Sequence, residues 1–174
     1  RGLHKDMRGL SAFGLHGFNS CQNQRQSFPH NLGMDVMART LWNKRVSFNK
    51  IVAETFTDAY GLDGPAVARF FRRMSQLAEP FFERVHTDNP ETDWIADGLG
   101  NLPKMRALLR RFRKVVRRHR AETAGAVQWS WRYLGIYLDM MNRWIPAVEA
   151  FLKRDPDCRA RYEALFEYLR GKEA

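Results

Sequence analysis

Apolar residues recur every three or four positions along most of this chain of 174 residues, which is the periodicity of amphipathic helices. Residues typical of helix ends sharpen the pattern. Asn31 and Ser47 are N-cap types, Gly61 is a C-cap type, and proline at position 65 suits a first helical turn. We therefore expect a helix over residues 3–13, ended by Gly14, and further helices that begin after positions 31, 47 and 64.

The second half of the chain continues this pattern with one interruption. We expect a basic helix over residues 104–120, a long and almost wholly apolar helix over about 126–153, and a last helix opened by Asp155 and Pro156. Pro80 should kink the helix that ends near residue 86. Residues 86–101 hold four acidic side chains and lack the periodicity, so we predict a surface loop there.

The spacing also predicts which side chains face inward in each helix. The expected inward residues are Met34, Met37, Ala38, Leu41 and Trp42 in the helix after Asn31; Phe48, Ile51, Val52, Phe56, Ala59 and Tyr60 in the next; Val67, Phe70, Phe71, Met74, Leu77, Ala78, Phe81, Phe82 and Val85 in the third; and Tyr162, Leu165, Phe166 and Leu169 in the last.

One short segment does not follow the helical pattern. Residues 17–21 look like a strand, which runs into six polar residues, 22–27, before the chain turns helical after Pro29. In α/β proteins, binding groups often lie on the loop at the carboxyl end of a strand. The simpler interpretation is a polar surface loop. No acidic residue lies between Asp6 and Asp35, so this loop offers neutral donors and one cation, Arg25, rather than a catalytic acid.

Composition excludes several classes of protein. Hydrophobic residues make up 44% of the chain, which is typical of a globular domain. The apolar stretch 127–152 is interrupted by charges and a proline, so it is not a membrane span. Cys21 and Cys158 lie far apart without motif spacing, which argues against a disulfide framework or a zinc site and favours a cytoplasmic location. No nucleotide-binding loop, nucleophile elbow or zinc-protease motif is present, and the histidines are scattered.

The formal net charge of +10 is concentrated in residues 104–120. The apolar residues of that segment form one stripe and the basic residues fill the other faces. We interpret it as a solvated outer helix that does not read a specific nucleic-acid sequence, because no aromatic residues interleave the basic face to stack bases.

At this point the chain resembles a known family. The resemblance is to bacterial glycoside-hydrolase-like proteins, domain of unknown function 4838, which are similar to the alpha-glucuronidases. It spans most of the chain and is carried by Gly14 to Gly17, Cys21-Gln22 with Arg25, Phe28-Pro29, Leu41-Trp42-Asn43, Tyr60-Gly61, and Ser130-Trp131 with Tyr133-Leu134.

The resemblance implies a mainly α fold. Residues 1–28 would be the last helix, last strand and substrate loop of a (β/α)8 barrel, and residues 29–174 a helical C-terminal domain. The chain begins inside an expected helix, so we expect a piece of a longer polypeptide. On this interpretation we expect Cys21, Gln22, Asn23, Arg25 and Phe28 to bind substrate. Amide and guanidinium groups are suited to hydrogen-bond sugar hydroxyls or a sugar carboxylate, and Phe28 or Trp42 could offer a stacking face. The resemblance assigns no catalytic residue, metal or cofactor to this chain.

The first functional hypothesis is therefore the C-terminal part of a carbohydrate-active, glycoside-hydrolase-like protein. Two carboxylates normally flank a scissile glycosidic bond, and they would lie upstream of this chain. The helical domain would buttress the upstream barrel or form a dimer contact. The alternative is a non-enzymatic helical interaction module, whose basic helix 104–120 binds an acidic partner or nucleic acid.

Overall fold

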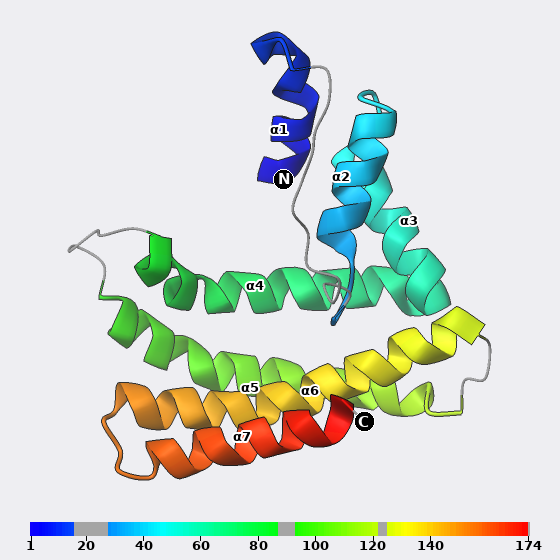
Figure 1. Cartoon of the computed structure of the whole chain (residues 1–174). Helices are drawn as coiled ribbons and strands as arrows, with labels where there is room; N and C mark the ends of the chain where they lie inside the picture. Colours follow the sequence, from blue (N-terminus) through cyan, green and yellow to red (C-terminus); the bar gives the residue numbers. More distant parts are fainter. Residues whose placement is uncertain (16–27, 87–92, 122–124, 174) are drawn as a thin grey trace. The chain divides into compact units, whose positions relative to one another are not determined.

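A computed structural model describes residues 1–15, 28–86, 93–121 and 125–173 (Figure 1). The prediction of a mainly α protein is confirmed, and no strand occurs in these ranges. The elements are α1 (Gly2–Gly9), η1 (Leu10–Phe13), α2 (Leu32–Trp42), α3 (Phe48–Tyr60), η2 (Gly61–Asp63), α4 (Gly64–His86), α5 (Trp94–Arg118), α6 (Gly125–Leu152) and α7 (Cys158–Glu173). The strand expected at residues 17–21 lies outside the described ranges, so the barrel segment stays a prediction.

The chain divides into two compact units. The first unit comprises Arg1–Ala68 and Thr123–Ser130, and the second comprises Arg69–Glu122 and Trp131–Ala174. This division is not the boundary expected between residues 28 and 29, where a barrel would end and a helical domain would begin. That boundary stays a prediction.

In the first unit, α1 packs against α2 and contacts the start of α3. His4 and Met7 are the buried residues of α1. The His4 ring donates through Nε2 to the Val46 carbonyl oxygen, at 3.0 Å, and its edge meets the ring of Phe48. A histidine on an otherwise apolar face is therefore satisfied by a hydrogen bond, and it fixes α1 to the turn before α3.

The helix-end signals at Gly14, Ser47 and Gly61 are confirmed. Gly14 and Gly61 have positive φ angles of 72° and 63°, a conformation that glycine adopts without steric cost. The Ser47 side chain accepts a hydrogen bond from the Lys50 backbone N–H at 3.2 Å, as an N-cap does. Asn31 stands at the N-cap of α2 but its side chain makes no capping hydrogen bond.

The predicted inner face of α2 is wrong. The buried residues are Val36 and Thr40, whereas Ala38, Leu41 and Trp42 are exposed. The Thr40 hydroxyl donates to the Val36 carbonyl oxygen at 2.6 Å, so this polar side chain enters the core with its hydrogen bond made. The expected inner face of α3 is confirmed for its centre, since Ile51, Phe56 and Tyr60 are buried.

The second unit has four helices whose successive members run in alternating directions (Figure 1). The Phe70 ring of α4 stacks on Phe112 of α5, with 4.2 Å between centroids. The Tyr137 ring of α6 packs against Phe71, and the Arg143 guanidinium lies 4.0 Å from the centre of the Tyr168 ring in α7. The long helix α6 therefore contacts the three other described helices of this unit.

Two sequence predictions fail in the second unit. Residues 94–101 are not a loop but the first turns of α5, which begins where the Asp93 carboxylate accepts from the Ala96 backbone N–H at 3.1 Å. This N-cap outweighs the acidic composition that favoured a loop. Phe82 and Phe166, both expected to face inward, are exposed because their helices turn those positions away from the core.

Candidate functional site

Most of the predicted substrate loop cannot be compared with the structure. Cys21, Gln22, Asn23 and Arg25 lie outside the described residues, and their assignment stays a prediction. Phe28 is described, and its side chain is 38% exposed.

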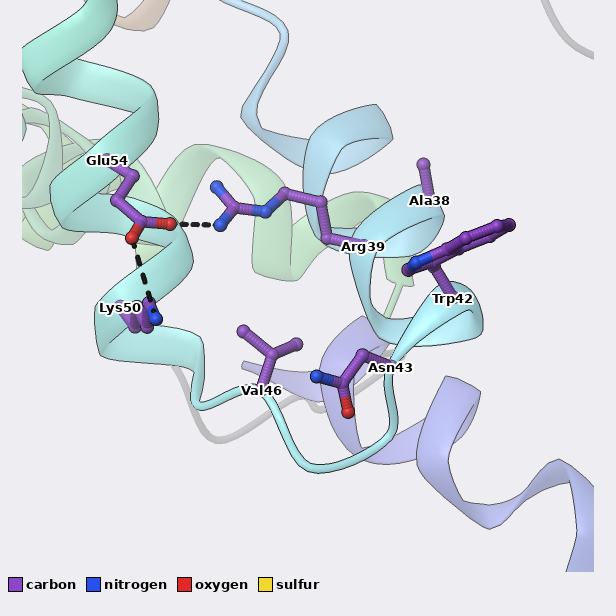
Figure 2. A pocket seen from close by; sticks show the side chains of 7 residues that line it. All are labelled: Ala38, Arg39, Trp42, Asn43, Val46, Lys50 and Glu54. Atoms are coloured by element: carbon purple, nitrogen blue, oxygen red, sulfur yellow. Dashed lines mark hydrogen bonds and ion pairs between the residues drawn. The ribbon is translucent and has the colours of Figure 1, made fainter.

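The first unit contains a groove formed by α2, α3 and the turn between them (Figure 2). Its volume is about 520 Å³, within the range of small-molecule sites. The lining residues are Ala38, Arg39, Trp42, Asn43, Val46, Lys50 and Glu54. The helix–turn–helix order brings residues 38–43 of one helix end opposite residues 50–54 of the next.

Three charged side chains cross this groove. The Arg39 guanidinium donates to the Glu54 carboxylate, and the Lys50 ammonium lies 3.8 Å from the other oxygen of that carboxylate. Behind them, the Asp35 carboxylate lies 3.8 Å from Arg39 and accepts a hydrogen bond from the Thr55 hydroxyl. Arg39 is thereby held between carboxylates from two helices, which fixes its guanidinium in the middle of the groove.

These contacts set the protonation state of Glu54. Its hydrogen bond from Arg39 lowers the pKa of the Glu54 carboxyl, and the positive charges of Arg39 and Lys50 act in the same direction. The same hydrogen bond raises the pKa of the Arg39 guanidinium. At neutral pH Glu54 is therefore an ionised acceptor and a poor proton donor, so it is not suited to act as a general acid.

Trp42 and Asn43 form the end of the groove contributed by α2. The Trp42 side chain is 93% exposed, although tryptophan is usually buried over much of its surface. The Asn43 side-chain oxygen Oδ1 accepts from the Arg45 backbone N–H at 2.9 Å, which leaves the side-chain NH₂ as a donor. An aromatic face beside an amide, a guanidinium and a carboxylate is suited to a ligand with one apolar face and several hydroxyl groups.

Sequence reasoning named Trp42 as a stacking face but did not find Arg39, Lys50 and Glu54. Their signal is present in the sequence, because Asp35 and Arg39, and likewise Lys50 and Glu54, stand four residues apart with opposite charges. What the sequence does not show is that these two pairs meet across α2 and α3.

Other chemistry is limited in the described part of the chain. No group of three or more His, Cys, Asp or Glu side chains there could hold a metal ion. A search of the same residues finds no helix long and apolar enough to span a membrane. Comparisons with protein-family models, with curated proteins and with solved structures found no match for this chain.

Proposed function

We propose that the chain is the C-terminal part of a glycoside-hydrolase-like protein and that the groove beside Trp42 binds carbohydrate. The observation that carries this proposal is the Trp42 indole, 93% exposed on the edge of a groove of about 520 Å³. An exposed indole gains little from packing in the free protein, but it offers a flat apolar surface to the C–H face of a sugar ring.

The polar side chains of the groove complete such a site. Asn43 offers an amide donor, Glu54 an ionised acceptor, and Arg39 the N–H groups that its ion pairs do not use. Arg39 and Lys50 line the groove with one carboxylate, Glu54, whereas the Asp35 carboxylate that also holds Arg39 lies behind the lining. The surface that meets a ligand therefore carries two cations and one carboxylate, which favours a sugar that carries a carboxylate, a uronic acid, over a neutral sugar.

The same groove argues against catalysis by this chain alone. Glycoside hydrolysis usually needs one carboxyl group that stays protonated and a second that is ionised. Among the described residues Glu54 is the only carboxylate that lines the groove, and its lowered pKa keeps it ionised. This supports the hypothesis that the catalytic acids lie upstream, with the 22–28 loop and the groove as binding elements.

The test is a titration of the chain with glucuronic acid, and separately with glucose, followed by the NMR signal of the Trp42 indole N–H. We expect the signal to shift with glucuronic acid and less with glucose. Trp42→Ala should abolish the saturable binding and leave the melting temperature unchanged, because the side chain packs against little. Trp42→Phe should retain part of the affinity.

Phe166→Ala provides the matched control, since Phe166 is another exposed aromatic residue and belongs to α7. It should leave sugar binding unchanged. Equal loss of binding in both variants, or no shift of the Trp42 signal at any sugar concentration, would refute the groove as a sugar site. Binding to nucleic acid that weakens steeply with salt would instead favour the interaction module based on residues 104–120.

A further inference from the structure

In the second unit, ion pairs join α5 to α6 along one stripe of each helix. Arg106 donates to Glu149, and the Arg113 guanidinium donates to the Asp139 carboxylate at 2.7 Å. The two helices are antiparallel (Figure 1). Residues with higher numbers in α5 therefore face residues with lower numbers in α6, as the pairs 106–149 and 113–139 show. Each of these two arginines is matched by an acid on the facing helix.

Arg110 lies between them on the same stripe, four residues after Arg106 and three before Arg113. The facing positions of α6 hold Asn142 and Arg143 instead of an acid. Arg110 makes no ion pair within the described part of the chain. Between these side chains lies a cavity of about 410 Å³ that is open to solvent. It is lined by Arg110, Arg113, Asp139, Asn142 and Arg143, of which Arg110, Asn142 and Arg143 are exposed residues.

The charges around this cavity are unbalanced. Three guanidinium groups line it and one carboxylate, Asp139, opposes them. Asp139 is already bonded to Arg113, and the Arg143 guanidinium is held by its hydrogen bond to the Asp139 carbonyl oxygen at 3.1 Å. Two fixed guanidinium groups and Arg110 therefore present donors to the cavity with a net charge of two.

A second observation concerns Tyr168 of α7, which lies under the Arg143 guanidinium. Its hydroxyl oxygen is shielded from solvent and makes no hydrogen bond with any described group. Burial raises the pKa of this phenol, as does the nearby Asp139 charge, so at neutral pH it is a donor. The ammonium of Lys172 lies 5.4 Å from the centre of the same ring.

We propose that Arg110, Arg113, Asn142 and Arg143 form a binding site for a tetrahedral oxyanion, either the dianionic phosphate group or the monoanionic sulfate group of a small ester. Guanidinium groups bind such groups through paired N–H donors, and a dianion neutralises the net charge of the lining. Asp139 positions Arg113. This site belongs to the second unit and does not depend on the groove beside Trp42.

The experiment is isothermal titration calorimetry of the chain with inorganic phosphate and, separately, with inorganic sulfate, at constant ionic strength set with chloride. We expect saturable binding of at least one, and the stronger of the two identifies the source of the group. Arg110→Gln should weaken binding by about tenfold or more, as expected for the loss of charge-assisted hydrogen bonds. The matched control is Arg111→Gln, an exposed arginine of α5 that does not line the cavity, and it should change the affinity less than twofold.

A second variant, Asn142→Asp, distinguishes loss of the site from loss of the fold, because it should abolish anion binding while stabilising the protein. An aspartate here supplies the missing acid, so it should pair with Arg110, raise the melting temperature and abolish binding of phosphate and sulfate. The proposal fails if neither anion binds above the chloride background. It also fails if Arg110→Gln and Arg111→Gln weaken binding equally, which indicates diffuse charge, or if Asn142→Asp binds as the wild type does.

Discussion

Gly64, the first residue of α4, should be intolerant of any side chain. Its backbone is right-handed helical, with φ −48° and ψ −48°, so alanine would fit the local conformation. The obstacle is packing, because a Cβ atom would stand 2.4 Å from the Phe56 carbonyl oxygen and 2.7 Å from the Thr57 nitrogen. Both are backbone atoms of α3 and cannot rotate away, so α3 and the start of α4 would have to separate.

The required displacement gives the magnitude. An ordinary contact begins at about 3.4 Å, so the two backbones must move apart by about 1 Å at this point. Overpacking of this kind typically costs about 1–3 kcal/mol, and more where only backbone can yield. The higher helix propensity of alanine offsets up to about 1 kcal/mol of this loss of stability. We expect Gly64→Ala to lower the free energy of unfolding of the first unit by about 2 kcal/mol.

The assay is urea denaturation followed by circular dichroism, with Gly33→Ala in α2 as the control. Gly33 also belongs to the first unit, but a Cβ atom there would meet nothing within 4 Å. It should leave the urea midpoint unchanged or raise it slightly. A Gly64→Ala midpoint at or above that of Gly33→Ala would refute the close approach of α3 and α4.

Two further predictions concern pH. The pKa of the Glu54 carboxyl is lower in the folded chain than in the unfolded chain. The ion pair with Arg39 therefore stabilises the fold above the ordinary glutamate pKa of about 4.3. This stabilisation is lost as the pH falls through the lowered pKa of the folded state. Glu54→Gln should flatten the dependence of the urea midpoint on pH between about 3 and 5, and an unchanged slope would contradict the ion pair. Burial raises the pKa of the Tyr137 phenol to about 12, so the unfolded chain loses this proton first and stability should fall above about pH 10. The measurement is ultraviolet absorbance of tyrosinate as a function of pH, in the wild type and in Tyr137→Phe. The two titration curves should differ near pH 12, where the Tyr137 phenol ionises. Curves that differ near pH 10 instead would contradict the burial of Tyr137.

The sequence predicts the helix ends best where the stabilising contact is local. Ser47 caps α3 through a backbone N–H three residues later, and Gly61 ends it through its own φ angle. Neither contact needs information from the rest of the fold. The start of α5 shows the limit of such reasoning, because Asp93 is an N-cap within a segment whose acidic residues and missing periodicity favoured a loop. Several residues of the segment could cap a helix. Which of them does so depends on how the following helix packs against the rest of the unit, and the local sequence does not contain that information.

That partner for α5 is visible at Gly98. A Cβ atom on Gly98 would stand 2.7 Å from the Phe81 ring of α4, so the two helices approach closely there. The Phe81 ring in turn meets the Trp144 ring of α6 edge to face. A glycine that looks like a loop residue in the sequence is therefore a packing residue, and this tertiary reason is absent from the local pattern.

The rotation of α2 has the largest consequence for the candidate site. Residues advance by about 100° around a helix, so burying Thr40 turns Trp42, two residues later, to nearly the opposite side. A hydrophobicity pattern places Trp42 in the core because tryptophan is more hydrophobic than threonine. In the structure Thr40 is buried instead, since its hydroxyl donates to the Val36 carbonyl oxygen one turn earlier, and the Val36 side chain is buried on the same face. The same rotation places Arg39 opposite Glu54 and leaves the indole on the edge of the groove. Trp42 is thus exposed on the side of α2 where the charged residues of the groove gather, which is the arrangement that the proposed sugar site requires.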